Sequence, residues 1–524
     1  MTLIKITPDK VQIKSDDDQL SGLSINDAVL IEDKTKGISL VCTISAITRN
    51  DDQEQFDYDG NLLDSEGSST IDCAVIGSLE KGVFTKAVDT YPTTDVAIRP
   101  VDLDTFRNMV SCDRDAAFKL GTYAAYDCDA VLDGNRFFQR HSAILGNTGS
   151  GKSCTVASIL EKVAPLKGAN VILFDLHGEY APLDYVQRVK IGNDGLSFPF
   201  WFLPLKDILG NLLRIKEESA QTQVAAFRKA FYTARASEKS EEIPLAFSIE
   251  SLISIMESEN TEEVQTGEYY KTGDKAGLPK TVKGDNNGKL TSVINLLKDK
   301  LIDKRYEFMA REHPQGYLNK FIDIVLGTTK GSIKVIDLSE VPSDIAPTLI
   351  AVITRLIYRV QLQQERDNIH PLCLICDEAH VYIPASDFGI GASQRRLLDI
   401  FETIAKEGRK FGVSLMVVSQ RPSELNRTIM AQCANFIVLK MSNDADKQMI
   451  KGILPEGSRG LIDSVNLFRP GDCLVIGDSA SITCKIRIDL PSQLPRSNTI
   501  DTWSVWESDN SINTNALVNK LIYS

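Results

Sequence analysis

Residues 141–164, HSAILGNTGSGKSCTVASILEKVA, decide the fold of this chain. They read as a short apolar strand, a glycine-rich loop and a helix, and the loop matches G-x-x-x-x-G-K-[ST] in full. Glycines allow backbone N–H groups to converge on phosphate oxygens, and the start of the helix adds partial positive charge. The sequence therefore predicts a phosphate-binding loop made of Gly146, Asn147, Thr148, Gly149, Ser150, Gly151, Lys152 and Ser153.

The ligand expected in such a loop is ATP with Mg²⁺. The Lys152 ammonium would reach the β- and γ-phosphates, and the Ser153 hydroxyl would ligate the Mg²⁺ ion. A chance glycine-rich turn is the alternative interpretation. The strand before the loop and the helix after it favour the phosphate-binding interpretation.

A second apolar run, PLCLIC, ends in the acidic pair Asp377-Glu378. A carboxylate at the tip of a buried strand can hold a metal ion or its water shell, and an adjacent carboxylate can act as general base toward water. We therefore predict that Asp377 binds the metal and that Glu378 is catalytic. A surface pair that caps a helix is the alternative.

Two more predicted strands end in polar side chains. Gln420 follows VSLMVVS and is expected to sense the γ-phosphate or orient the attacking water, unless it only hydrogen-bonds the strand end. Asp175, His177 and Glu179 lie in FDLHGEY, where they could contact the nucleotide or metal-bound water. Glu179 is the stronger candidate of the three, because a lone histidine is more often structural.

Strands alternate with helices from residue 141 onward, which predicts an α/β fold with a parallel sheet. Residues 205–330 differ, because their apolar residues recur at helical spacing around a polar stretch near 257–288 that we expect to be a mobile loop. The predicted organisation has five parts: a small β-barrel (1–100), a nucleotide-binding core in two parts (101–205 and 331–495), a helical insertion (206–330) and a C-terminal arm (496–524).

Charge is distributed unevenly along the 524 residues, whose net charge is -13. Residues 1–100 contain 9 basic and 18 acidic side chains, so this part alone contributes -9. A protein that coats DNA is usually basic, so this chain is not of that class. We expect the acidic barrel to bind protein, and any DNA site to be a local patch elsewhere.

The cysteines and the hydropathy indicate an intracellular protein. No run of 18 apolar residues and no signal-peptide pattern is present, so we expect a cytosolic location without a membrane anchor. The 10 cysteines are scattered and do not suggest a disulfide framework. Cys373 and Cys376 form a CxxC, but they lie on one predicted buried strand and are expected to pack in the core.

Basic residues are frequent between residues 395 and 421. Most helical basic side chains simply face solvent, but ATPase rings need an arginine that reaches the γ-phosphate of a neighbouring subunit. Arg409 precedes the strand VSLMVVS and is our first candidate, with Arg421 and Arg396 next. The basic residues in this region are Arg395, Arg396, Lys406, Arg409, Lys410 and Arg421.

The order of these motifs resembles the HerA family of the FtsK–HerA ATPases over most of residues 1–500. The resemblance rests on the β-rich N-terminus, GNTGSGKS, FDLHGEY, ICDEAH, EGRKFG, VSQRP and NFIVLKMSNDAD. It implies a RecA-like P-loop core, a homo-hexameric ring around double-stranded DNA, a barrel that docks partners and a C-terminal segment that braces the neighbour. Leu176 stands where the family often has proline, which changes no expected role.

Two functions fit this resemblance. The first is a DNA-translocating ATPase that works with a nuclease or another effector in DNA processing or anti-phage defence. The second is a ring-shaped scaffold whose ATPase regulates a bound nuclease or NAD-consuming enzyme. A two-lobed DEAH helicase is disfavoured because no second lobe with its arginine motif follows, and conjugation ATPases usually carry membrane anchors.

Overall fold

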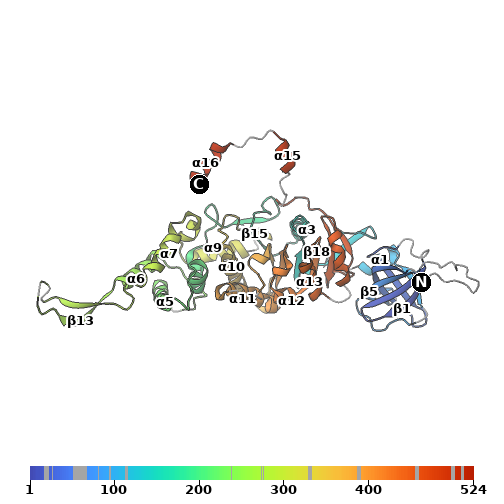
Figure 1. The fold of residues 1–524 in the computed structure, drawn as a ribbon, viewed down its shortest axis with the longest axis horizontal. Helices are drawn as coiled ribbons and strands as arrows, with labels where there is room; N and C mark the ends of the chain where they lie inside the picture. The colour runs from blue at the N-terminus through green and yellow to red at the C-terminus, as the bar shows by residue number, and fades with distance from the viewer. Residues whose placement is uncertain are drawn as a thin grey trace, which may run out of the picture.

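The computed structural model describes most of the chain. The described residues are 1–16, 23–25, 27–50, 68–80, 82–93, 96–111, 116–237, 239–272, 274, 277–327, 333–385, 391–454, 459–496, 502–508 and 513–523. Figure 1 shows an elongated arrangement, with the N-terminal strands at one end, a large α/β sheet in the middle and a helical segment with a thin hairpin at the other end.

The described residues of the central unit form an eleven-stranded sheet. Its order is β12-β15-β11-β16-β17-β10-β18-β19-β20-β8-β9. The first seven strands in this order run parallel, and the last four continue the sheet in antiparallel pairs. In the order of the sheet, the strands are β12 (Gln187–Lys190), β15 (Ile333–Asp337), β11 (Val171–Asp175), β16 (Leu372–Cys376), β17 (Val413–Ser419), β10 (His141–Leu145), β18 (Cys433–Leu439), β19 (Asp472–Gly477), β20 (Lys485–Ile488), β8 (Ala117–Tyr123) and β9 (Cys128–Asp133).

The parallel strands are buried on both faces, which explains why they read as unbroken apolar runs. Along β10, Ala143 and Leu145 belong to one hydrophobic core, and Ile144 between them belongs to the other. Helices α10 (Ala346–Gln361), α11 (Ala392–Glu407) and α12 (Arg427–Gln432) pack on the first face, and α3 (Lys152–Val163) packs on the second. The α/β fold predicted from the sequence is confirmed.

The carboxyl ends of the parallel strands meet at one edge of the sheet. The segment that follows β10 lies between those that follow β17 and β18, because β10 pairs with both of these strands. Loops at such a position leave a crevice in which ligands commonly bind in open α/β sheets. The glycine-rich loop follows β10, so the fold places it at this edge.

The N-terminal strands form a separate antiparallel sheet in the order β1-β2-β5-β4-β3-β7, with β6 added beside β5. The end strands β1 and β7 do not pair with each other among the described residues, so this unit is an open half-barrel, not the closed barrel that we predicted, and it is called the barrel below. One side of the sheet holds a core that includes Val11 and Ile31. Ala28, Leu30 and Val41 face the other way and join the second core of the central unit. The strands are β1 (Thr2–Ile6), β2 (Lys10–Asp16), β3 (Ala28–Asp33), β4 (Ile38–Asn50), β5 (Ser68–Glu80), β6 (Val83–Thr85) and β7 (Val96–Pro100).

Residues 101–140 are more than the connector that the sequence suggested. Helix α1 (Leu103–Val110) packs between the barrel and the central unit, and β8 and β9 extend the central sheet before α2 (Gly134–Phe138). These strands are only partly buried because they lie at the antiparallel border of the sheet, so their apolar pattern is weaker than that of the central strands.

The insertion packs its helices onto the face that α10 and α11 cover. Its elements are α4 (Leu205–Asp207), the π-helical turn η4 (Ile208–Leu212), α5 (Gln221–Arg235), α6 (Ile249–Thr261), α7 (Thr291–Ile302), α8 (Glu307–Ala310) and α9 (Gly316–Leu326). The helical spacing of residues 212–236 gives a helix only from Gln221 onward, because α5 spans Gln221–Arg235.

The polar stretch near 257–288 is not the loop that we predicted. It contains the end of α6 and an exposed hairpin of β13 (Glu263–Tyr269) and β14 (Pro279–Lys283), which projects from the insertion in Figure 1. Cross-strand contacts stabilise it, including Thr281 Oγ1 donating to Glu263 at 2.7 Å and the Lys280–Glu268 ion pair at 3.0 Å. All of β13 and most of β14 are exposed, so no buried face marks these strands in the sequence.

The C-terminal segment leaves the body of the molecule as two short helices, α15 (Thr502–Glu507) and α16 (Thr514–Tyr523), seen above the sheet in Figure 1. Trp503 and Trp506 are exposed on α15. Among the described residues, none of the helices combines the length and the apolar character that crossing a bilayer would require.

Candidate ATPase site

The glycine-rich loop forms the turn between β10, which ends at Leu145, and α3, which begins at Lys152. Gly149 and Gly151 have φ angles of 73° and 104°, in the left-handed region that side chains disfavour. A Cβ atom at Gly146 would lie 2.8 Å from the Leu439 Cβ atom, too close for any side chain. Glycine is therefore required by conformation at two positions and by packing at a third.

Lys152 is largely buried at the start of α3. Its ammonium donates to the backbone carbonyl of Asn147 at 3.2 Å, which folds the side chain back over the loop. Burial lowers the pKa of Lys152, and the carboxylates of Glu378, Asp377 and Glu179 oppose that shift. The lysine charge therefore lies among acidic groups contributed by two other strand ends.

Asp377 directly follows β16 and is buried. Burial, together with the nearby carboxylates of Glu378, Glu179 and Asp175, raises the pKa of Asp377 to about 8. One of its carboxylate oxygens accepts from the Glu378 backbone N–H at 3.0 Å. Ionised carboxylates so close together repel one another, and a cation bound among them would relieve that repulsion.

Glu378 has a left-handed backbone, with a φ angle of 45°. This conformation turns the chain sharply from β16 into the 3-10 turn Ala379–Val381, and the Tyr382 hydroxyl donates to the Asp377 carbonyl at 2.9 Å to hold the turn. Non-glycine residues in this region are uncommon and concentrate at functional sites. Nothing in the sequence indicated this backbone conformation.

His380 is a site residue that the sequence analysis did not assign. Its Nδ1 atom lies 3.3 Å from Glu378 Oε2 and 3.3 Å from Ser419 Oγ. Burial lowers the pKa of His380, so the ring is neutral near pH 7. His380 thus links the end of β16 to the end of β17. Its position in the stretch D-E-A-H, shortly after the acidic pair, could have identified it from the sequence.

The FDLHGEY segment is organised by its aspartate. Asp175 accepts backbone N–H groups from His177, Gly178, Glu179 and Tyr180 at 2.8 to 3.2 Å. This wraps the chain around one carboxylate, so Asp175 shapes the turn, and the His177 side chain is left exposed. Glu179 differs, because its Oε2 atom is buried without a hydrogen-bond partner among the described residues.

Gln420 lies directly beside the glycine-rich loop. Its side-chain carbonyl accepts a hydrogen bond from the Thr148 hydroxyl. The first residue after β17 therefore contacts the loop after β10, as expected for neighbouring parallel strands.

The site has features that fit a phosphorylated ligand and a cation. The side-chain oxygens Ser150 Oγ, Glu179 Oε2 and Glu378 Oε2 are buried without hydrogen-bond partners among the described residues. Buried polar atoms normally have partners, so these three indicate a ligand that supplies them. Within the described residues no three His, Cys, Asp or Glu side chains form a metal cage. Mg²⁺ typically takes only one or two protein carboxylates, with phosphates and water completing its shell.

The basic residues of the 395–421 region do not join this site. Arg409 is exposed in the turn that precedes β17, at the opposite edge of the sheet from the glycine-rich loop. Arg396 is engaged by Asp207 at 3.4 Å and by Glu242, and Arg421 pairs with Glu424 at 3.0 Å. Arg409 therefore lies away from the glycine-rich loop of its own chain, and it could complete this site only in a neighbouring subunit.

Cys373 and Cys376 are both buried in β16 and face opposite cores. They therefore point away from each other across the sheet and cannot bind one metal ion together.

The glycine-rich loop, the acidic pair after β16 and the polar residue after β17 define a P-loop nucleotide hydrolase. The comparison with protein families narrows this class, because residues 118–357 match "Helicase HerA, central domain". Over this central part, the chain is therefore similar to HerA helicases.

Individual curated proteins and solved structures are also similar to this chain. The chain is 28% identical to the DNA double-strand break repair helicase HerA of Saccharolobus solfataricus over 384 residues, which cover 72% of this chain and 69% of the relative. It is 26% identical over 408 residues to the helicase of the same name from Sulfurisphaera tokodaii, covering 75% and 73%. Among solved structures, VirB4 of Thermoanaerobacter pseudethanolicus aligns with a TM-score of 0.48 and 14% identity, covering 72% of this chain and 97% of that one.

Proposed function

We propose that this chain hydrolyses ATP with Mg²⁺ and uses the energy to translocate double-stranded DNA as a HerA-type motor. The observation that supports this proposal most strongly is the cluster of acidic side chains around Lys152. Three acidic side chains, Asp377, Glu378 and Glu179, lie near its ammonium, although they come from segments far apart in the sequence.

Each residue has a role in this proposal. Backbone N–H groups of residues 146–153 bind the phosphates, and the Lys152 ammonium neutralises charge on the transferring phosphoryl group. Glu378 accepts a proton from the attacking water, and Gln420, which contacts the loop through Thr148, positions that water. Glu179 supports the same water or the metal's water shell.

Ser153 and Asp377 would hold the Mg²⁺ ion. The ion would supply electrostatic stabilisation to the phosphate oxygens during transfer. The raised pKa of Asp377 fits this role, because a nearby cation favours the ionised carboxylate that the cluster of acids disfavours.

The larger assembly that we propose is a homo-hexameric ring around duplex DNA. The printed names of the relatives describe DNA repair helicases, which supports DNA as the substrate. The position of Arg409, across the sheet from its own loop, supports a site completed by a neighbouring subunit. Repulsion between the acidic barrel and phosphates supports docking of a protein effector there, such as a nuclease or an NAD-consuming enzyme in anti-phage defence.

The test is ATP turnover by the purified full chain with and without duplex DNA, and with and without any protein that co-purifies from its source. Lys152→Ala should abolish turnover in each condition while the fold is retained, because loss of the ammonium removes charge compensation during phosphoryl transfer. DNA-stimulated turnover supports the motor. Turnover that ignores DNA but responds to the effector would favour the regulatory scaffold, and unchanged turnover in Lys152→Ala would refute the site.

A further inference from the structure

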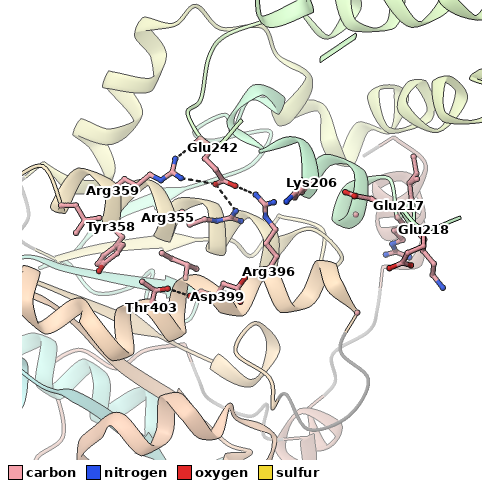
Figure 2. A pocket seen from close by; sticks show the side chains of 17 residues that line it. Lys206, Glu217, Glu218, Glu242, Arg355, Tyr358, Arg359, Arg396, Asp399 and Thr403 are labelled. Atoms are coloured by element: carbon pink, nitrogen blue, oxygen red, sulfur yellow. Dashed lines mark hydrogen bonds and ion pairs between the residues drawn. The ribbon is translucent and has the colours of Figure 1, made fainter. Parts of the chain in front are cut away.

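A large groove lies between α10 and α11, separate from the glycine-rich loop. Its volume is about 1070 Å³, and its walls come from both helices, from η4 with the turn after it, and from Glu242. Figure 2 shows arginines from α10 and α11 directed toward the Glu242 carboxylate at one side of this groove. The volume is sufficient for a ligand of nucleotide size.

Three arginines of the groove, Arg355, Arg359 and Arg396, pair with the carboxylates of Asp207 and Glu242, and Arg396 also lies 3.8 Å from Glu241. Asp207 is fully buried and accepts from Arg355 at 2.7 Å, while Arg396 Nε lies 3.4 Å from its other oxygen. Asn211 also donates to Asp207, at 3.0 Å. Asp207 therefore holds Arg355 by a hydrogen bond and attracts Arg396 electrostatically, both from behind the groove.

Glu242 is the second counterion and lies nearer solvent. Its carboxylate contacts Arg396 directly and lies 3.8 Å from Arg355 and 3.4 Å from Arg359. Arg235 holds the loop that carries it by donating to the backbone carbonyls of Lys239, Ser240 and Ile243. Arg359 also donates to the Glu242 backbone carbonyl. Because these contacts are to the backbone, the Glu242 side chain can leave the arginines while the loop backbone stays in place.

The lining is basic in an otherwise acidic protein. Six of the lining side chains are basic and four are acidic, whereas the whole chain carries a net charge of -13. Guanidinium groups held in fixed positions suit phosphate oxygens, because their paired N–H groups match that geometry. Tyr358 and Ile400 add an apolar surface to the same groove.

The backbone beside the groove is unusual. The π-helical turn η4 forms part of the wall, and Arg214, which lines the groove, has a φ angle of 55°. Single π-helical turns and left-handed non-glycine residues concentrate at functional sites. These two features are independent of the charges.

We propose that this groove binds a phosphate group between Arg355, Arg359 and Arg396, and that the Glu242 carboxylate occupies the phosphate position when no ligand is bound. The phosphate belongs either to a free nucleotide or polyphosphate or to a nucleic-acid backbone. Binding displaces Glu242 and leaves Asp207 in place. The site is distinct from the glycine-rich loop and does not depend on the role proposed for that loop.

The experiment measures binding of inorganic tripolyphosphate and, separately, of a short DNA duplex by calorimetry. All variants carry Lys152→Ala, so that anion binding at the glycine-rich loop is weakened equally throughout. Glu242→Gln removes the competing charge and should tighten binding about tenfold. Arg359→Gln should weaken it about tenfold, because a hydrogen bond from a charged group is worth roughly that much.

Two exposed residues provide matched controls. Glu218→Gln removes a carboxylate from the lining with no arginine contact recorded among the described residues, and Arg366→Gln removes an arginine beyond the groove; both should change binding less than threefold. If the two variants change the binding of tripolyphosphate but not of the duplex, the ligand is a small phosphate compound. If they change the binding of the duplex but not of tripolyphosphate, the ligand is a nucleic-acid backbone. If neither probe responds to Glu242→Gln or Arg359→Gln, or if the controls respond equally, the proposal is wrong.

Discussion

Two adjacent acids after β16 have different surroundings and therefore different chemistry. Asp377 is buried among carboxylates, whereas Glu378 contacts the neutral His380 and has an oxygen without a hydrogen-bond partner among the described residues. A general base needs an oxygen that can accept a proton from water, and we propose that the exposed side of the Glu378 carboxylate supplies it.

We predict that Glu378→Gln binds ATP normally but turns it over at least about a hundredfold more slowly, as loss of a general base typically does. The amide keeps the size of the side chain, so the turn after β16 should persist. Single-turnover hydrolysis and nucleotide titration measure the two properties separately. Glu424→Gln, an exposed acid that pairs with Arg421, is the control and should keep the wild-type rate. A variant that lost affinity but kept its rate would make Glu378 a metal ligand or a structural residue.

His141 illustrates a residue whose neutral form is required by its neighbours. Its Nδ1 atom accepts the Leu415 backbone N–H at 2.9 Å, and Nε2 faces the Ala405 carbonyl at 3.0 Å. Because Nδ1 is an acceptor, the ring is neutral with its proton on Nε2. Burial lowers the pKa of His141 in the folded protein.

The stability of the protein should therefore fall as pH decreases through the unfolded histidine pKa of about 6.5. Below that pH the unfolded state binds a proton that the folded state resists, so the stabilising difference is present above it and lost below it. We predict that His141→Gln, measured by thermal unfolding at pH 8 and pH 5, loses less stability on acidification than the wild type. An equal loss in both proteins would show that other groups dominate the acid response.

Helix α1 joins the barrel to the central unit. Phe106 is fully buried, stacks on Tyr126 with ring centroids 3.7 Å apart, and meets the edge of Tyr123 at 5.1 Å. The Tyr126 hydroxyl in turn accepts the Ala28 backbone N–H of the barrel at 3.3 Å. The aromatic cluster thus connects β3 of the barrel with β8 of the central sheet.

We predict that Phe106→Ala lowers the free energy of unfolding by about 3–5 kcal/mol, the usual cost of removing a buried aromatic ring. The matched control is Leu103→Ala on the same helix, whose partly exposed side chain should cost less than about 1 kcal/mol. Chemical denaturation monitored by tyrosine fluorescence measures both. Equal losses in the two variants would show that the aromatic cluster does not hold the two units together.

At the scale of the whole molecule, the candidate ATPase site and Arg409 lie at opposite edges of the central sheet. Arg409 is the arginine that we propose acts on the site of a neighbouring subunit. Under this proposal a neighbouring subunit completes the site, so hydrolysis depends on assembly. An arginine supplied by another subunit is typically worth about 10³–10⁵ in rate.

We predict that Arg409→Ala assembles and binds ATP but hydrolyses it poorly, and that mixing it with Lys152→Ala restores part of the activity. In mixed rings, an intact loop from the first variant can face an intact Arg409 from the second. ATP turnover after verified subunit exchange is the measurement, with each variant alone as control. Absence of recovery would assign Arg409 a role within its own subunit and direct attention to Arg421, since Arg396 is engaged by Asp207 and Glu242.

Much of the fold and of the candidate site could be predicted from sequence because local patterns determine them. A buried parallel strand must be apolar throughout, and a loop that cradles phosphates needs glycine at particular positions. Residues 146–153, Asp377, Glu378 and Gln420 were therefore identified from their places at strand ends. Parallel strands bring those ends to one edge, so their proximity followed from the fold class.

Only the tertiary structure decided the features that depend on contacts between distant segments. The left-handed Glu378, the bridge through His380 and the Asp207–Glu242 arginine cluster join residues that no local pattern relates. The hairpin at β13 and β14 was missed for a related reason, because its exposed strands bury no apolar face to leave a periodic pattern. A sequence records which residues must be buried or bent, whereas the pairing of charges is fixed by the packing of helices and strands that brings them together.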